Sequence, residues 1–187
     1  SGTLGAKADW SGILPMQLSG SSFTFQPADA ANAAHDISLA SVLSGAGNLV
    51  KSGSGTLALN GTNSYTGTTT ITAGRLLVNG SLAAGSMVTV ASGGTLGGTG
   101  TIGGPATVQS GGTLSPGNAI GTLTFSSSLT LAAGGTSFFE ISKSPLTNDV
   151  VKVSGALTNG GTLFVTNISA SAFAAYDSFQ LFNAASY

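Results

Sequence analysis

Few side chains in this sequence could do chemistry. The 187 residues include five Lys or Arg, six Asp or Glu, one His and no Cys. The single histidine, His35, stands beside Asp36, and a Ser-His-Asp triad would use such a pair. In a chain rich in serine and threonine, however, a hydroxyl lies near any histidine by chance. We therefore expect His35 to be an exposed residue of an alanine-rich loop and not a catalytic base.

The carboxylates are scattered singly between neutral residues, at Asp9, Asp29, Asp36, Glu140, Asp149 and Asp177. Polysaccharide-degrading enzymes need paired carboxylates, and calcium sites need several together. Glu140 and Asp149 are the nearest pair in the C-terminal half. Glu140, however, alternates with Phe139 and Ile141 and should point outward. The sequence therefore predicts no catalytic residue, no metal site and no enzyme, and polysaccharide degradation is a less favoured alternative.

Glycine and basic residues also fail to form a recognisable site. The pattern Gly98-x-Gly100-x-x-Gly103 has the letters of a dinucleotide-binding fingerprint, but no helix pattern and no acid follow where that motif needs them. No cofactor is predicted. The basic residues, spread from Lys7 to Lys152, are too few for the stripe that tracks nucleic-acid phosphates. No apolar run approaches the roughly 18 residues of a membrane span. We expect no nucleic-acid partner and no membrane insertion by this segment.

Two patterns suggest contacts with sugars or ordered water. Trp10 and Tyr65 could stack on rings of host or matrix glycans, although single aromatics more often pack inside. Four threonines alternate onto one face: Thr66, Thr68, Thr70 and Thr72. Ice binding would need such a threonine pair on successive coils. Two other pairs are out of register with them: Thr99/Thr101 and Thr122/Thr124. Glycan binding is thus an alternative function, and ice binding a less favoured one.

The elements that must position these residues come from a repeat. The tripeptide G-(T/R)-L begins at Gly55, Gly74, Gly94 and Gly112, with spacings of 19, 20 and 18 residues, and recurs at Gly161. The weaker Gly135-Thr136 divides the last gap, and less regular copies are Gly2-Thr3-Leu4 and Gly121-Thr122-Leu123. A repeat of about 20 residues indicates a solenoid, in which each unit buries its apolar side against its neighbours.

Apolar residues alternate with Thr, Ala, Ser or Lys after these glycines, in runs of four to six residues. This period of two is typical of strands with one buried face. The alternating pairs are Leu57/Leu59, Val88/Val90, Leu123/Phe125, Leu129/Leu131, Phe139/Ile141, Val151/Val153 and Leu163/Val165. The only helix candidates, residues 27–35 and 170–176, lack caps and an apolar stripe, so we expect a loop or a single helical turn at each place. The fold predicted is an all-β, parallel β-solenoid of roughly nine coils of about 20 residues.

Composition supports a folded chain over a disordered one. Apolar residues make up 41% of the sequence and charged residues 6%, with a net charge of −1. Disordered segments combine low hydrophobicity with high charge, which is the opposite balance. We expect one domain over residues 1–187. Its divisions are a less regular region (1–44), the clearest repeat (45–82) and further coils (83–187).

Residues 45–82 resemble the autotransporter-associated β-strand repeat. That pattern runs G-x-G-x-L-x-K-x-G-x-G-T-L-x-L-x-G-x-N-x-Y-x-G-x-T-x-I-x-x-G-x-L. It is matched by Gly45, Gly47, Leu49, Lys51, Gly53, Gly55, Thr56, Leu57, Leu59, Gly61, Asn63, Tyr65, Gly67, Thr69, Ile71, Gly74 and Leu76. The resemblance implies a right-handed parallel β-helix, exported and displayed at a bacterial surface as a stalk or passenger. Segments 93–104, 114–125 and 148–165 resemble sequences that often follow such repeats.

These observations predict a non-catalytic structural module, a rigid stalk or fibre element outside the cell or on its surface. Solenoid ends need caps, because an open end is an exposed sheet edge. Neither end carries a charged amphipathic helix, and the final and first residues read naturally as one more coil when joined. We therefore expect a piece of a longer β-helix or end-to-end self-association. The alternative is an adhesin or glycan-binding passenger.

Overall fold

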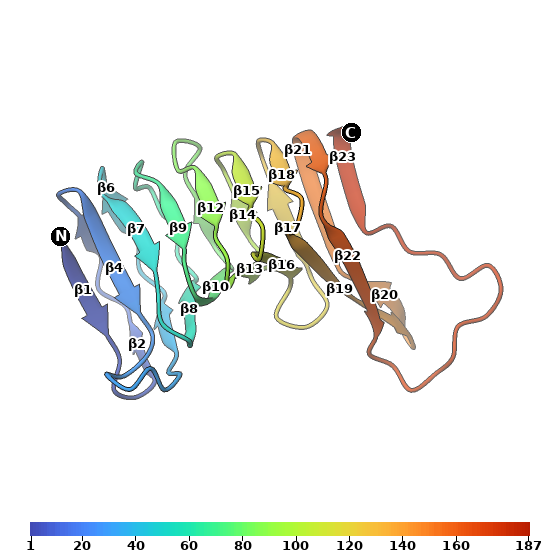
Figure 1. Ribbon diagram of the computed structural model, residues 1–187, viewed down its shortest axis with the longest axis horizontal. Coiled ribbons are helices and arrows are strands. Elements are labelled where there is room, and N and C mark those ends of the chain that lie inside the picture. Colours follow the sequence, from blue (N-terminus) through green and yellow to red (C-terminus); the bar gives the residue numbers. More distant parts are fainter.

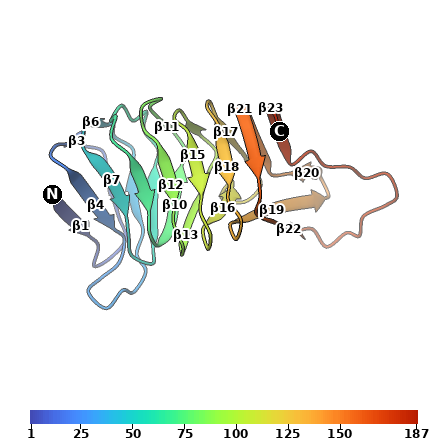
Figure 2. The ribbon, with the colours of Figure 1, turned by 45° about the horizontal axis from the view of Figure 1, so that its top comes forward.

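The computed structural model describes all 187 residues and consists of 23 strands joined by turns and loops. The strands of successive coils pair in parallel and form three faces that run along a rod (Figure 1). The first and last strands lie at opposite ends of the rod in both ribbon views (Figure 2). The chain contains no helix with the length and hydrophobicity needed to cross a membrane. The predicted parallel β-solenoid is therefore confirmed, while its right-handedness stays a prediction.

Three faces, here named A, B and C, carry the strands of each coil in chain order. Face A holds β1 (Gly2–Gly5), β4 (Ser22–Gln26), β7 (Asn48–Lys51), β9 (Thr69–Ile71), β12 (Val88–Val90), β15 (Ala106–Val108), β18 (Leu129–Leu131) and the second half of β21 (Val150–Asn159). Face B holds β2 (Trp10–Gly12), β5 (Ile37–Leu39), β8 (Thr56–Leu59), β10 (Gly74–Val78), β13 (Gly94–Gly98), β16 (Thr113–Pro116), β19 (Thr136–Lys143) and β22 (Thr162–Asn167). Face C holds β3 (Met16–Leu18), β6 (Leu43–Gly45), β11 (Ser81–Leu82), β14 (Thr101–Ile102), β17 (Thr122–Phe125), the first half of β21 and β23 (Phe182–Ser186). The short β20 (Leu146–Asn148) pairs antiparallel with β19 as a hairpin outside the rod.

The coils are fewer and longer than predicted, with about seven turns of roughly 23 residues. Along face A, paired residues are 20, 19 and 18 positions apart between Leu49 and Ala106. The step from Phe23 to Leu49 takes 26 residues, and the step from Leu129 to Leu157 takes 28. Extra residues lie at the corners and in the β19–β20 hairpin, where they lengthen a coil without adding a rung to the rod. The estimate of nine coils is wrong for this reason.

The G-(T/R)-L tripeptides lie above one another on face B. Leu57, Leu76, Leu96 and Leu114 pair in successive strands, and each side chain is fully buried. The glycine two residues before each leucine lies at the corner between faces A and B. A Cβ atom at Gly94 would lie 2.6 Å from the Ile71 carbonyl oxygen, closer than real Cβ contacts. The repeat spacing therefore reflects one leucine and one tightly packed corner per coil.

Residues that alternate inward form one continuous core of 29 buried side chains. The predicted inward pairs are buried with one exception, in β22. There Leu163 and Val165 are 44% and 45% exposed, although their partners on β19, Ser137 and Phe139, are buried. Both point to the interior, but β22 is the last strand of face B and no further coil covers them. The prediction that this pair is buried is wrong because the core is open at this end.

The loop candidates are confirmed as loops. In residues 27–35, Ala28 and Ala34 form an antiparallel bridge, and the Asp29 carboxylate accepts hydrogen bonds from the amides of Ala31 and Ala33 at 2.9 and 2.8 Å. These bonds close a turn that bulges from the second coil. Residues 170–176 are also free of helix and belong to a long loop between β22 and β23.

Polar residues of the 45–82 repeat act inside the rod. Lys51 is fully buried, and its Nζ donates to the carbonyls of Ser52, Gly53 and Ala73 at 2.8, 2.8 and 2.9 Å. Burial lowers the pKa of Lys51 to about 8, while Asp36 acts in the opposite direction. These three carbonyls lie at the corner of two successive coils, so the ammonium ties one coil to the next.

Asn63 also ties successive coils together, at another corner of the rod. Its side-chain oxygen accepts from the Leu43 amide at 3.0 Å, and its Nδ2 donates to the carbonyls of Gly61 and Ser81 at 2.9 and 3.1 Å. In this way one side chain satisfies backbone groups of three successive coils. Buried backbone groups need such partners where a sheet ladder is interrupted.

Candidate functional site

The two aromatic residues predicted to contact glycans lie in very different places. Trp10 is half-buried at the N-terminal end of the rod, where it packs against the core. Tyr65 is fully buried, and its hydroxyl lies 2.6 Å from Thr69 Oγ1, which in turn lies 3.0 Å from Ser86 Oγ. Desolvation raises the pKa of Tyr65 to about 12. Tyr65 therefore presents no surface to a glycan, and the prediction that it contacts a glycan is wrong.

His35 is half-buried, not exposed as predicted. Its nearest charged partner is Asp9, with 3.6 Å between His35 Nδ1 and Asp9 Oδ1. The neighbouring Asp36 instead accepts a hydrogen bond from the Thr56 amide at 3.1 Å. Both carboxylates also bind backbone amides, since Asp9 accepts from the amide of Asp36 at 2.8 Å. These contacts of Asp9, His35 and Asp36 join the first three coils.

A threonine ladder does exist, on the outer side of face A. Its members pair in register from coil to coil: Thr70, Thr89, Thr107, Thr130 and Thr158. The positions two residues on carry Ala91 and Gln109 in two of these coils, so no second threonine rank runs beside it. The pairs Thr99/Thr101 and Thr122/Thr124 do not belong to this ladder, because Thr101 pairs with Thr124 on face C. The paired surface required for ice binding is therefore not formed.

The N-terminal end of the rod opens into an apolar pocket of about 590 Å³. It is lined by Leu4, Trp10, Ser11, Gly12, Ile13, Leu14, Pro15, Met16 and Leu39. Ile13 and Leu14 project from the corner after β2 and are 80% and 77% exposed. Large side chains with this exposure on a structured corner are typical of interaction surfaces when they lie beside an apolar hollow.

The C-terminal end is also apolar, and it carries a protrusion. Leu163 and Val165 of β22 present the uncovered core described above. Beyond β22, residues 168–181 leave the rod as a long loop before the chain returns to β23 (Figure 1). Two aromatic residues of this loop, Phe173 and Tyr176, are 39% and 101% exposed. Long ordered loops on a rigid frame frequently serve recognition.

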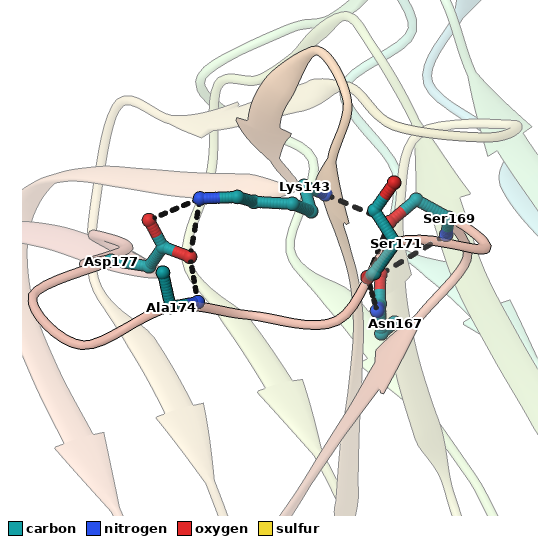
Figure 3. Close-up of polar contacts among 6 residues, drawn as sticks. All are labelled: Lys143, Asn167, Ser169, Ser171, Ala174 and Asp177. Carbon is teal, nitrogen blue, oxygen red and sulfur yellow. Dashed lines mark hydrogen bonds and ion pairs between the residues drawn. The ribbon is translucent and has the colours of Figure 1, made fainter.

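One ion pair fastens this loop to the β19–β20 hairpin (Figure 3). Lys143 Nζ lies 2.7 Å from each carboxylate oxygen of Asp177, and the same carboxylate accepts from the Ala174 amide at 2.7 Å. The Lys143 backbone amide also donates to Ser169 Oγ at 3.0 Å. The side-chain oxygen of Asn167 accepts hydrogen bonds from the amide and the hydroxyl of Ser169 and so fixes the turn after β22. These bonds to Lys143 hold the pKa of Asp177 below its usual value.

A second hollow, the side pocket, lies on the outer surface of face B. It has a volume of about 510 Å³ and is lined by Arg75, Ser115, Pro116, Asn118, Ala119, Phe138, Glu140 and Ile168. Glu140 points outward, as its alternation predicted. From the sequence, Arg75 was identified only as a residue of the repeat. Nothing in the sequence indicates that it lines the same pocket as Glu140, because the two are 65 residues apart.

A buried carboxylate supports the side pocket from below. Asp149 is 1% exposed, and its oxygens accept from the amides of Gly121 and Glu140, each at 2.8 Å. Burial is the main cause that raises the pKa of Asp149, while the hydrogen bonds from the Glu140 and Gly121 amides, and more weakly Arg75, oppose this effect. Three of the chain's eleven charged side chains thus meet at one corner. No group of three or more His, Asp or Glu side chains is arranged to hold a metal ion anywhere in the structure.

Taken together, the fold defines a parallel β-solenoid of the kind found in passengers of autotransporters. Residues 49–78 match the family described as the passenger-associated-transport-repeat. The predicted resemblance is confirmed for this segment, which holds most of β7, all of β8, β9 and β10, and the lysine and tyrosine described above. Repeats of this family belong to autotransporter passengers, which are typically surface-exposed or secreted. No curated protein matches the chain.

Proposed function

We propose that this chain is a non-catalytic, extracellular structural module, a rigid rod in a stalk or fibre of a bacterial surface protein. The observation that carries the proposal is the unbroken stack of parallel strands on faces A and B, from β1 and β2 to β21 and β22. Seven steps of about 4.8 Å give a rod roughly 34 Å long. Because every inner coil bonds to both neighbours, the rod holds its shape without disulfides, which a chain with no cysteine cannot form.

The two ends support an assembly from identical copies. One end offers the apolar pocket beside Ile13 and Leu14, and the other offers the uncovered Leu163 and Val165. Strands β2 and β22 are the outermost strands of the same face, so each has an unpaired backbone edge. Joining β22 of one copy to β2 of another would continue the ladder. Such head-to-tail contacts do not close on themselves and produce filaments.

Negative-stain electron microscopy over a concentration series tests this proposal. We expect filaments one solenoid wide to lengthen as concentration rises. The double substitution Ile13→Ser and Leu14→Ser should shorten them, since both side chains are exposed and their loss does not disturb the core. Met87→Ser is the matched control, because Met87 is 47% exposed on the side of the rod. Isolated rods at every concentration, or filaments unchanged by the double substitution, would refute end-to-end assembly.

A further inference from the structure

The side pocket on face B has the composition of a small-molecule site. Its volume of about 510 Å³ lies within the range of ligand pockets. It combines a guanidinium, a carboxylate and a carboxamide, from Arg75, Glu140 and Asn118, with the apolar surfaces of Phe138 and Ile168. We propose that it binds one neutral pyranose unit of a glycan. This function goes beyond the rod and does not depend on whether rods assemble end to end.

The floor of the pocket is made by Arg75 lying across a neighbouring strand. Gly97 leaves the room for it, because a Cβ atom there would lie 3.2 Å from Arg75 Nη2 and 2.5 Å from the Ser115 carbonyl oxygen. Arg75 Nη2 donates to the Gly117 carbonyl oxygen at 2.9 Å. A guanidinium has five N–H donors, so this bond fixes its position and leaves others for a ligand.

The aromatic side of the pocket continues onto open surface. Phe138 is half-buried in the pocket, and its partner in the next strand, Phe164, is 54% exposed on the same outer surface. Two phenylalanines in register on adjacent strands place an apolar strip beside the polar groups. The C–H face of a pyranose packs on such a strip while its hydroxyls reach outward. A fully apolar ligand would leave Glu140 without a partner, which is costly.

The wall of the pocket is a loop held in an uncommon conformation. Ala119 has a φ of 146°, rare for a residue with a side chain, and Gly117 has a φ of 76°. Gly117 exchanges two backbone hydrogen bonds with Gly98, at 3.1 and 2.9 Å, and the buried Asp149 carboxylate holds the amide of Gly121. Strain that persists because its surroundings fix it is characteristic of functional sites.

Charge in the pocket favours a neutral ligand. Arg75 and Glu140 line the same pocket, and Arg75 is close enough to the buried Asp149 to affect its pKa. The positive charge of Arg75 is therefore balanced by two nearby carboxylates. The carboxylate of an acidic sugar would approach Glu140 as well as Arg75. Sugar hydroxyls suit this mixed surface, because each can donate to Glu140 and accept from Arg75 or Asn118.

Saturation-transfer-difference NMR with cellobiose, lactose and mannobiose as neutral probes, and digalacturonate as the acidic probe, tests the proposal. We expect transfer to at least one neutral probe and weaker transfer to digalacturonate. Glu140→Gln should weaken binding of that probe about tenfold, since it removes a charged acceptor. Phe164→Ala should weaken it about threefold to tenfold. Its ring is exposed, so the variant should keep the melting temperature of the parent.

Lys152→Gln is the matched control, because Lys152 is exposed on face C and its loss also changes the net charge by one. It should leave binding within twofold of the parent. The proposal is overturned if no neutral probe shows transfer, if digalacturonate binds more tightly than every neutral probe, or if neither Glu140→Gln nor Phe164→Ala weakens binding.

Discussion

Lys51 offers the sharpest test of how the repeat is held together. Its ammonium is buried in the row of core residues between Phe25 and Ile71 and binds three carbonyls. Lys51→Met keeps the apolar stem and removes the donors. Hydrogen bonds from a charged donor contribute about 1.5–3 kcal/mol each, so three would be worth roughly 5–9 kcal/mol.

Against this gain stands the cost of burying the charge. Burial lowers the pKa of Lys51 from 10.5 to about 8. At about 1.4 kcal/mol per pKa unit this difference corresponds to at most about 3 kcal/mol, and solvent screening reduces it to roughly 2. The bonds should outweigh this cost. We therefore expect Lys51→Met to lower the free energy of unfolding at pH 7 by about 3–7 kcal/mol.

The pH dependence of the same pair of proteins gives an independent check. Between pH 8 and 10.5 the unfolded chain keeps a proton on Lys51 that the folded chain has lost, so parent stability should rise with pH by about 2 kcal/mol relative to Lys51→Met. Urea unfolding followed by circular dichroism at pH 7, 8, 9 and 10 measures the difference, in which the other titrating groups cancel. A difference between the two proteins that stays constant or shrinks over this window would refute the idea that burial disfavours the ammonium.

Three further predictions concern the core and the C-terminal protrusion. Leu96→Ala, in the middle of the leucine stack, should cost about 3 kcal/mol in urea unfolding, against less than about 1 kcal/mol for the outward-facing Thr95→Ala. Tyr65→Phe should cost about 1–2 kcal/mol and abolish a loss of stability between pH 10 and 12. That loss arises because the raised pKa of Tyr65 keeps the folded phenol protonated where the unfolded one ionises. Asp177→Asn should lower the hydrogen-exchange protection factor of the Ala174 amide, the observed rate being divided by the intrinsic rate at the same pH. Acidification of the parent below the lowered pKa of Asp177 should lower the same protection factor. Equal protection factors in both proteins at pH 7 would contradict the role of Asp177 in holding the loop.

The sequence was a good guide wherever one residue type recurs at each coil. Leucines such as Leu57 and Leu76 could be placed in one stack because each follows a corner glycine at nearly the same spacing. The number of coils could not be predicted, because residues 27–35 and the β19–β20 hairpin add chain length without adding a rung. Strand alternation alone does not distinguish an inner strand from the last strand of the rod, which is why Leu163 was misplaced.

Polar residues were harder to assign than apolar ones. Lys51 stands two residues after Leu49, so strict alternation would place it inward, but a lysine there conflicts with the rule that charges stay outside. From the sequence, Lys51 was therefore identified only as a match to the repeat. The position of Tyr65 depends on hydroxyl partners from two coils, Thr69 and Ser86, which no local pattern reveals. Arg75, Glu140 and Asp149 lie close together because of the register of four coils. They also do so because Gly97, which has no side chain, leaves room for Arg75. Such convergence can be seen only when the coils are stacked in three dimensions.

The stacking direction also determines how the rod would respond to tension. Its strands run across the long axis, and its first and last strands lie at opposite ends (Figure 1). A force applied to the two ends therefore breaks the hydrogen bonds between coils one coil at a time. It does not have to shear several strands at once. Each coil of roughly 23 residues would release up to about 75 Å of extended chain in place of one rung of about 4.8 Å. Under load the rod would lengthen one coil at a time, and each step would absorb work.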